Sequence, residues 1–266
     1  MTRSLPRLAA VLGALCTAAV TVLVAPAPAH AAAVDYVALG DSYSSGVGAS
    51  GTSGSCSRSD RAYGPLYAAA ADVASFRFPA CGGAVTQDVI NDQLSSVTSR
   101  TDLISITIGG NDAGFATTAA TCVLGSDAVC AGAVANARRY ITGTLPGRLD
   151  ATYAAIRQRA PGATVVVLGY PRLFETTATC GIAGLSLAKR QAMNAAADDL
   201  ATVISARAGA AGFRFADARP AFAGHGVCAS REWITRVSPL SVGTSYHPNN
   251  NGYALGYLPA LRSALD

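Results

Sequence analysis

Short apolar segments alternate along this chain with longer alanine-rich stretches, and this alternation constrains the fold more than any other feature. Apolar runs of strand length, with β-branched residues dominating the third and fourth, occupy residues 34–39, 75–79, 102–108, 163–168 and 212–216. Helices are predicted between them, over residues 61–73, 86–97, 133–159, 187–208 and 251–265. In the third helical stretch Leu145, Leu149, Tyr153 and Ile156 recur at helical spacing, and Pro146 is expected to interrupt it.

Strands that alternate with helices predict an α/β fold with a parallel sheet covered on both faces. A disordered chain is excluded, because half of the residues are hydrophobic and only 14% are charged. Sheets of this kind bind ligands beyond the carboxyl ends of their strands. The residues that follow the strands are therefore the candidates for a functional site.

Four short segments stand at these places. They are Gly-Asp-Ser-Tyr-Ser (40–44), Cys-Gly-Gly-Ala-Val-Thr (81–86), Gly-Gly-Asn-Asp (109–112) and, before the last predicted helix, Ser-Tyr-His-Pro-Asn (245–249). A parallel sheet can bring all four to one edge, although they are far apart in the sequence.

The residue types in these segments suit nucleophilic catalysis. Ser42 can expose its hydroxyl at a strand-to-helix turn, and His247 on a facing loop can take its proton. The N–H groups of Ser42 and Gly83 and the amide of Asn111 can form an oxyanion hole.

Each of these residues also has a plainer interpretation. Ser42 could be a helix N-cap, and Gly82 could be the donor in place of Gly83. Asn111 could cap a helix, and His225 is the other histidine beyond the first 31 residues. The four segments together favour the catalytic interpretation.

The four segments, in this order and spacing over residues 34–258, resemble the blocks of the GDSL, or SGNH, hydrolases, above all secreted actinobacterial lipases and esterases. The resemblance implies a three-layer α/β/α sandwich, flavodoxin-like, with a central, mostly parallel five-stranded sheet. It implies that Ser42 is the nucleophile and His247 the general base. Ser42, Gly83 and Asn111 would supply the oxyanion hole, and no metal or organic cofactor would be needed.

One position departs from the family pattern. An aspartate usually stands three residues before the histidine, and Thr244 stands there in this chain. We therefore expect a Ser–His dyad in which a backbone carbonyl near Thr244 or Ser245 accepts a hydrogen bond from His247 Nδ1. A remote aspartate such as Asp217 is the alternative.

Residues 1–31 have the pattern of a secretory signal peptide. An uncharged apolar run follows Arg3 and Arg7, and Ala-His-Ala at the end of the segment is a cleavage site. The alternative is a membrane anchor, but the apolar run is short for a bilayer span. We expect a secreted, extracellular protein with a single SGNH hydrolase domain over residues 32–266.

Six cysteines lie beyond the predicted signal, and an even number in an exported chain indicates disulfides. Zinc is the rival interpretation, but no Cys-x-x-Cys pair exists and histidine is scarce. Six cysteines allow 15 pairings. We expect sequential pairs, of which the middle one closes the shortest loop: Cys56–Cys81, Cys122–Cys130 and Cys180–Cys228.

The net charge and the placement of the glycines argue against nucleic acids and dinucleotides as partners. The chain has 20 basic and 16 acidic side chains, and its first 31 residues hold two of the basic ones, so the remainder carries only +2. That is too little for a nucleic-acid surface. The glycines at 46–51 match a dinucleotide pattern, but they begin several residues past the strand and lead into a loop.

The four segments predict a serine hydrolase of carboxylic esters. The family resemblance implies that it acts on lipid esters, and we expect a monomer with transient contact to a lipid interface. Phospholipase A1 and carbohydrate acetylesterase are the alternatives within the family. A binding protein without catalytic activity is disfavoured because Ser42, Asn111 and His247 are all present. The apolar residues Leu173, Phe174, Ile182 and Leu185 could line an acyl groove or simply fill the core.

Overall fold

In the computed structural model, five parallel strands form one sheet in the order β2–β1–β3–β4–β5. They are β1 (Asp35–Gly40), β2 (Ser75–Arg77), β3 (Leu103–Thr107), β4 (Thr164–Leu168) and β5 (Arg214–Ala216). Each strand overlaps one of the predicted apolar runs. The side chains of β3 are all buried, as are those of β1 beyond its first residue, because helices cover both faces. The predicted α/β class and parallel five-stranded sheet are confirmed.

The structure describes residues 1–2, 34–71, 73–176, 180, 185–237 and 242–266. Contacts divide the chain into Met1–Ala32 and Ala33–Asp266, and the sheet belongs to the second part. Nearly all of the predicted signal segment, and Ile182, lie outside the described residues. No helix in the described part of the chain is long and apolar enough to cross a membrane.

The described helices alternate with the strands. The α-helices are α1 (Ser42–Ser45), α2 (Tyr63–Ala71), α3 (Thr86–Asp88), α4 (Phe115–Leu124), α5 (Asp127–Gly143), α6 (Leu145–Arg159), α7 (Leu187–Ala210), α8 (Ala218–Ala221) and α9 (Leu258–Ser263). Two π-helical segments, η1 (Val89–Gln93) and η4 (Gly252–Tyr257), and two 3₁₀ turns, η2 (Leu94–Ser96) and η3 (Val242–Thr244), complete the set.

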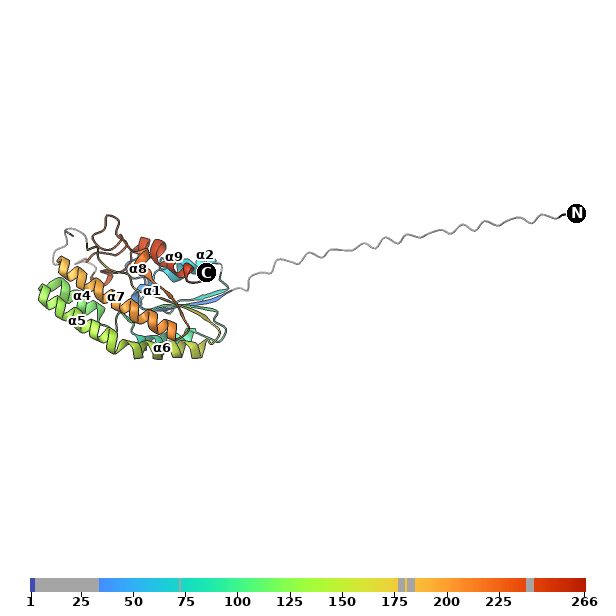
Figure 1. The fold of residues 1–266 in the computed structure, drawn as a ribbon, viewed down its shortest axis with the longest axis horizontal. Helices are drawn as coiled ribbons and strands as arrows, with labels where there is room; N and C mark the ends of the chain where they lie inside the picture. Colours follow the sequence, from blue (N-terminus) through green and yellow to red (C-terminus); the bar gives the residue numbers. More distant parts are fainter. Residues whose placement is uncertain (3–33, 72, 177–179, 181–184, 238–241) are drawn as a thin grey trace. The chain divides into compact units, whose positions relative to one another are not determined.

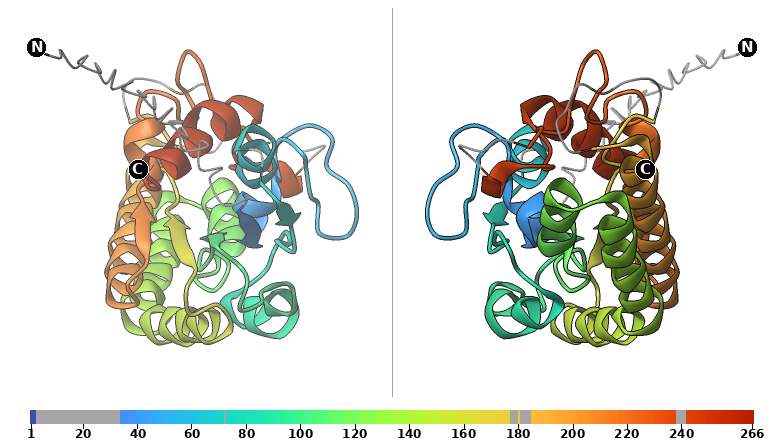
Figure 2. Two further views of the ribbon diagram at one scale, coloured as in Figure 1. Left: turned by 90° about the vertical axis from the view of Figure 1, so that its right-hand side faces the viewer. Right: turned by 90° about the vertical axis from the view of Figure 1, so that its left-hand side faces the viewer.

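The helices form one layer on each face of the sheet (Figures 1 and 2). One layer contains α2, η4 and α9, and the other contains η1, α6 and α7, with α5 packed against α7. The buried side of α6 carries Leu145, Leu149, Tyr153 and Ile156, the predicted periodic residues. The sandwich of two helical layers around a sheet is thus the one that the family resemblance implies.

Several helical regions differ from the prediction, including 251–265, where the π-helical η4 precedes α9, and the short helices α1 and α8, which were not predicted. The stretch at 86–97 is not one α-helix but α3, η1 and η2 in succession. The long stretch at 133–159 begins earlier, at Asp127, and divides into α5 and α6 at Thr144, with Pro146 in the first turn of α6, where its missing N–H costs nothing. The sequence analysis did not predict α4, whose short threonine- and alanine-rich segment lacks a clear apolar period.

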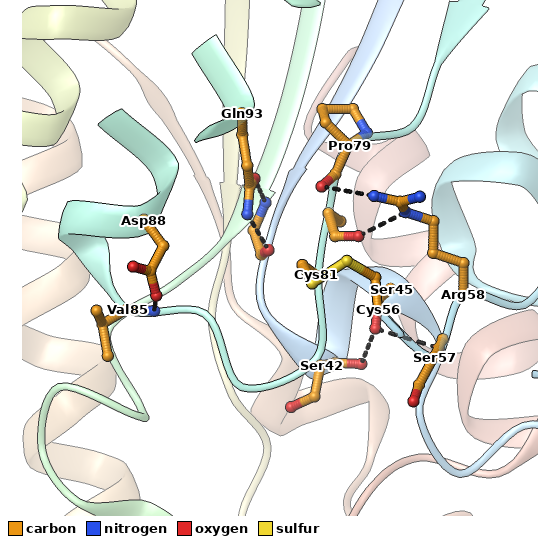
Figure 3. Close-up of a disulfide and its surroundings, with 12 residues drawn as sticks. Ser42, Ser45, Cys56, Ser57, Arg58, Pro79, Cys81, Val85, Asp88 and Gln93 are labelled. Carbon is orange, nitrogen blue, oxygen red and sulfur yellow. Dashed lines mark hydrogen bonds between the residues drawn. A yellow bond between two sulfur atoms is a disulfide. The ribbon is translucent and has the colours of Figure 1, made fainter. Parts of the chain in front are cut away.

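Three disulfides join Cys56 to Cys81, Cys122 to Cys130 and Cys180 to Cys228. These are the sequential pairs that the sequence analysis expects. The second disulfide fixes the end of α4 to the first turn of α5, and the first lies beside Ser42 (Figure 3).

The carboxyl end of β1 is held by its neighbours on both sides. Gly40 pairs in register with Thr107 of β3, and the N–H of Asp41 donates to the Thr107 carbonyl over 3.0 Å. The buried Gln93 amide accepts from the Gly40 N–H at 2.7 Å and donates to the Gly40 carbonyl at 2.9 Å (Figure 3). Gly40 has a φ of +123°, and a Cβ there would lie 2.4 Å from the Thr107 carbonyl oxygen.

We predict that Gly40→Ala lowers the free energy of unfolding by about 3 kcal/mol or more, because backbone strain and a clash with fixed backbone add together. Gly51→Ala is the matched control, since Gly51 also has a positive φ (+73°) but a Cβ added there would meet no atom within 4 Å. Its cost should be about 1–2 kcal/mol. Urea unfolding of both variants measures the difference, and equal losses would contradict the prediction.

Candidate active site

The turn between β1 and α1 presents Ser42 at the edge of the sheet. Asp41 is the N-cap of α1, and its Oδ1 accepts the N–H of Tyr43 at 2.9 Å. The capping role therefore belongs to Asp41, and the Ser42 hydroxyl is available for another partner. The N–H of Ser42 makes no hydrogen bond within the described residues, as expected for the first turn of a helix.

The hydrogen-bond partner of the Ser42 hydroxyl is His247. Its Nε2 lies 2.7 Å from Ser42 Oγ, and its Nδ1 lies 2.9 Å from the carbonyl oxygen of Ser245. A carbonyl oxygen can only accept, so Nδ1 carries the proton and Nε2 is left to accept the Ser42 hydroxyl proton. Of the two carbonyls that the sequence analysis named, the one at Ser245 faces the ring. The Thr244 carbonyl accepts the backbone N–H of His247 at 3.3 Å and also acts to raise the pKa of the ring.

Burial governs the charge of His247. The side chain is only 7% exposed, and burial lowers the pKa of His247 to about 4. The hydrogen bonds with the Ser245 and Thr244 carbonyls oppose this shift without cancelling it. Asp217, the alternative acidic partner, instead caps α8 and pairs with Arg219 at 2.7 Å. The imidazole is therefore neutral at pH 7.

Tyr43 connects the turn that carries Ser42, here called the serine turn, to the loop that carries His247. Its hydroxyl donates to the carbonyl of Tyr246 at 2.5 Å, and its ring centroid lies 5.1 Å from that of His247. Tyr246 holds a positive φ of +61°, which turns the chain into His247. Gly48 lies so close that a Cβ there would stand 2.9 Å from His247 Cβ, so this glycine allows the loops to approach.

The predicted oxyanion donors lie beside Ser42. The N–H of Gly82 is occupied by the Cys56 carbonyl at 2.9 Å, whereas the N–H of Gly83 makes no hydrogen bond within the described residues. Gly83 rather than Gly82 is therefore the available donor. Asn111 donates one amide hydrogen to the Ala84 carbonyl at 3.0 Å, which orients the side chain and leaves its second hydrogen for a ligand.

Ser42, Gly83, Asn111 and His247 line one wide groove of about 680 Å³. A second hollow, an apolar cavity of about 70 Å³, is also lined by Ser42 and Asn111 but extends between α4, α5 and α7. Leu173 lines this cavity, whereas Phe174 and Leu185 are buried in the core and line neither hollow. The four predicted residues, from segments far apart in the sequence, are thus brought to one site.

Tyr170 was missed by the sequence analysis. It follows β4, and its buried hydroxyl donates to Asp41 Oδ2 and accepts the N–H of Gly110 at 2.9 Å. It thereby joins the serine turn to the loop of Asn111. Burial raises the pKa of Asp41 to about 7, although the hydrogen bonds from Tyr170 and the Tyr43 N–H oppose the shift. Applying the rule about strand ends to β4 would have pointed to this residue.

His225, the rival histidine, lies outside the groove. Its Nδ1 is 2.9 Å from the Arg231 carbonyl, and its ring stacks on Trp233 with centroids 3.7 Å apart. The glycine loop at 46–51 ends α1 at Gly46 and passes beside His247, so the loop shapes the site and does not form the helix start that a dinucleotide would need.

Comparison with known proteins agrees with this geometry. Residues 38–255 match the GDSL-like Lipase/Acylhydrolase family. Lipase 1 of Streptomyces coelicolor is 51% identical over 255 residues, which is 95% of this chain and 93% of that protein. The crystal structure of an extracellular lipase from Streptomyces rimosus is 53% identical, with a TM-score of 0.85 over 87% of this chain and 100% of that one.

The crystal structure of phospholipase A1 from Streptomyces albidoflavus is 50% identical, with a TM-score of 0.85 over 88% of this chain and 100% of that one. Fold, sequence and family match agree over nearly all of residues 34–266. The chain is therefore a carboxylic ester hydrolase that belongs to the GDSL-like lipase/acylhydrolase family.

Proposed function

We propose that this protein is an exported hydrolase of lipid esters in which Ser42 is the nucleophile and His247 the general base. The observation that carries the proposal is the pair of contacts made by one imidazole ring. Nε2 lies 2.7 Å from Ser42 Oγ while Nδ1 lies 2.9 Å from the Ser245 carbonyl, so the ring is held in the tautomer that a general base requires.

The reaction follows from these positions. As Ser42 Oγ attacks the ester carbonyl, its proton passes to His247 Nε2. The tetrahedral oxyanion accepts hydrogen bonds from the N–H groups of Ser42 and Gly83 and from the Asn111 amide. His247 then gives the proton to the departing alcohol, and an acyl-enzyme remains on Ser42. Water, activated by His247 in the same way, releases the carboxylic acid.

A backbone carbonyl replaces the usual aspartate in this scheme. It fixes the tautomer and the orientation of the ring, which is a large part of what the acidic residue does in a triad. It carries no full negative charge, so it stabilises the imidazolium less. The depressed pKa of His247 is consistent with this weaker support.

Lipid esters are the substrate class that the site favours. The wall of the groove contributed by α4 is apolar and includes Ala116, Ala119, Ala120 and Val123. Close relatives are named lipases. Phospholipids are the second candidate, because a protein 50% identical to this chain is a phospholipase A1. For this chain we therefore propose fatty-acyl esters, with the sn-1 ester of phospholipids as the alternative.

Export is a further part of the proposal. Residues 1–31 have the composition of a cleaved signal, which leaves a single domain over residues 32–266. Three disulfides support it, since such bonds persist mainly in oxidising compartments.

We predict that Ser42→Ala abolishes ester hydrolysis, with a loss on the order of 10⁴–10⁶ in kcat, because the attacking oxygen is removed. Initial rates of the wild type and the variant on p-nitrophenyl esters from acetate to palmitate measure this loss. Serine-dependent rates that include medium or long chains support a lipase or phospholipase, and phosphatidylcholine then separates the two. Activity confined to acetate would favour an acetylesterase, and an unchanged rate in Ser42→Ala would overturn the assignment of the nucleophile.

The pH dependence of kcat/KM tests whether His247 is the general base. Protonated His247 cannot accept the serine proton, and its pKa of about 4 lies below the ordinary histidine value. We expect kcat/KM to stay nearly constant from pH 7 down to about pH 5.5 and to fall only as the pH approaches that pKa. His225→Ala should leave the profile unchanged. An acid limb centred at pH 6.5 or above in the wild type would contradict the prediction.

The dyad makes a separate prediction for Thr244. Because the backbone carbonyl of Ser245 holds the ring, Thr244→Ala should keep kcat within about threefold of the wild type on a soluble ester. His247→Ala, the matched comparison three residues away, should lose several orders of magnitude. A hundredfold loss in Thr244→Ala would show that the threonine side chain supports the base.

A further inference from the structure

The apolar cavity beside Ser42 is distinct from the groove that contains the base. His247 and Gly83 line the groove and not the cavity, whereas Ser42, Asn111 and Phe115 line both. The cavity continues away from the serine between two packed helices, α5 and α7, which lie side by side in Figure 1. Its walls there are contributed by Val134, Ala137, Ile141, Met193, Ala197 and Leu200.

The geometry of the tetrahedral intermediate assigns the two hollows to different parts of an ester. The reacting carbon has four substituents: Ser42 Oγ, the oxyanion, the leaving oxygen and the acyl carbon. The oxyanion lies toward Gly83, and the leaving oxygen must face His247 to receive its proton, so both lie on the groove side. The acyl carbon is left to point away from these groups, and Ser42 and Asn111 also line the cavity.

The chemistry of the cavity suits an acyl chain. The polar groups near its serine end bind one another: Tyr170 donates to Asp41 Oδ2, and Asp41 Oδ1 accepts the Tyr43 N–H. A hydrocarbon chain that enters therefore leaves none of these groups without a partner. An apolar lining of this kind favours an apolar ligand over water.

We propose that the cavity between α5 and α7 binds the first part of the acyl chain, and that Ala137 and Met193 set how many of its carbons the cavity holds. The inference rests on the proposed function of Ser42 and His247. A cavity of roughly 150 Å³ holds benzene, so 70 Å³ holds about the first three carbons beyond the carbonyl, and the rest of a fatty-acyl chain lies outside it. Ala137 lines the cavity, so a larger side chain at this position would reduce its volume. Met193 also lines the cavity, so a smaller side chain at this position would enlarge it.

The experiment compares kcat/KM over p-nitrophenyl esters from acetate to decanoate. In the wild type we expect kcat/KM to rise by about fourfold for each methylene from acetate to butyrate, the gain from burying one methylene. Ala137→Leu adds three carbons to the wall and should lower the butyrate-to-acetate ratio by about tenfold. Ala135→Leu, an exposed position on the same helix, is the control and should keep the wild-type ratio.

A second variant works in the opposite direction and remains decisive if Ala137→Leu does not fold. Met193→Ala should extend the rise in kcat/KM with chain length by two or three carbons. Circular dichroism of each variant checks that the fold is retained.

The experiment distinguishes failure of the inference about the cavity from failure of the proposed function. If Ala137→Leu and Met193→Ala change the rates on all chain lengths by the same factor, the cavity does not bind the acyl group, and the proposed function stands. If the wild type has no Ser42-dependent rate on any ester, the proposed function itself is wrong, and the inference falls with it.

Discussion

The parallel alignment of the five strands is the constraint on which the site depends. Because all strands run the same way, the loops after β1 and β3 and the loop after β4 leave the sheet at one edge, which brings Ser42, Asn111 and Tyr170 together. Hydrogen bonds then fix these loops to one another. Gln93 holds Gly40, Tyr170 connects Asp41 to Gly110, and the Asn111 amide reaches Ala84. The serine turn is therefore held by contacts from three directions before any substrate arrives.

In the proposed mechanism, His247 acts as a general base without a carboxylate partner. The Ser245 carbonyl sets the tautomer, and Tyr43 holds the preceding residue through the Tyr246 carbonyl. Orientation is thus supplied entirely by neutral groups. The electrostatic consequence is that burial is opposed only by carbonyl hydrogen bonds, so the pKa of His247 is depressed. In the proposed mechanism, a neutral imidazole can accept a proton at neutral pH, but the imidazolium of the transition state gains less stabilisation than it would beside an aspartate.

Under the proposed function, the groove and the cavity beside Ser42 have different roles. The groove is lined by the proposed base and oxyanion donors, and in this proposal its wider space takes the leaving alcohol. The cavity contains paired polar groups at the serine end and apolar walls beyond them. Phe115, at the start of α4, stands between the two. The position of α4 is in turn fixed by the Cys122–Cys130 disulfide to α5, so this disulfide contributes to the shape of the site.

The sequence by itself determined the strand and helix alternation, the residues at the strand ends and the expected cysteine pairs. These depend on local periodicity and on residue types at definite spacings, which one chain displays directly. The tertiary structure decided the rest. The choice of the Ser245 carbonyl, the roles of Tyr170 and Gln93, the helix α4 and the cavity between α5 and α7 depend on contacts between residues distant in sequence. Asp41 and Tyr170 are 129 residues apart, and no local pattern of either residue indicates the other. Burial makes the hydrogen bond between two such residues important, because a buried polar group that has no hydrogen-bond partner is destabilising.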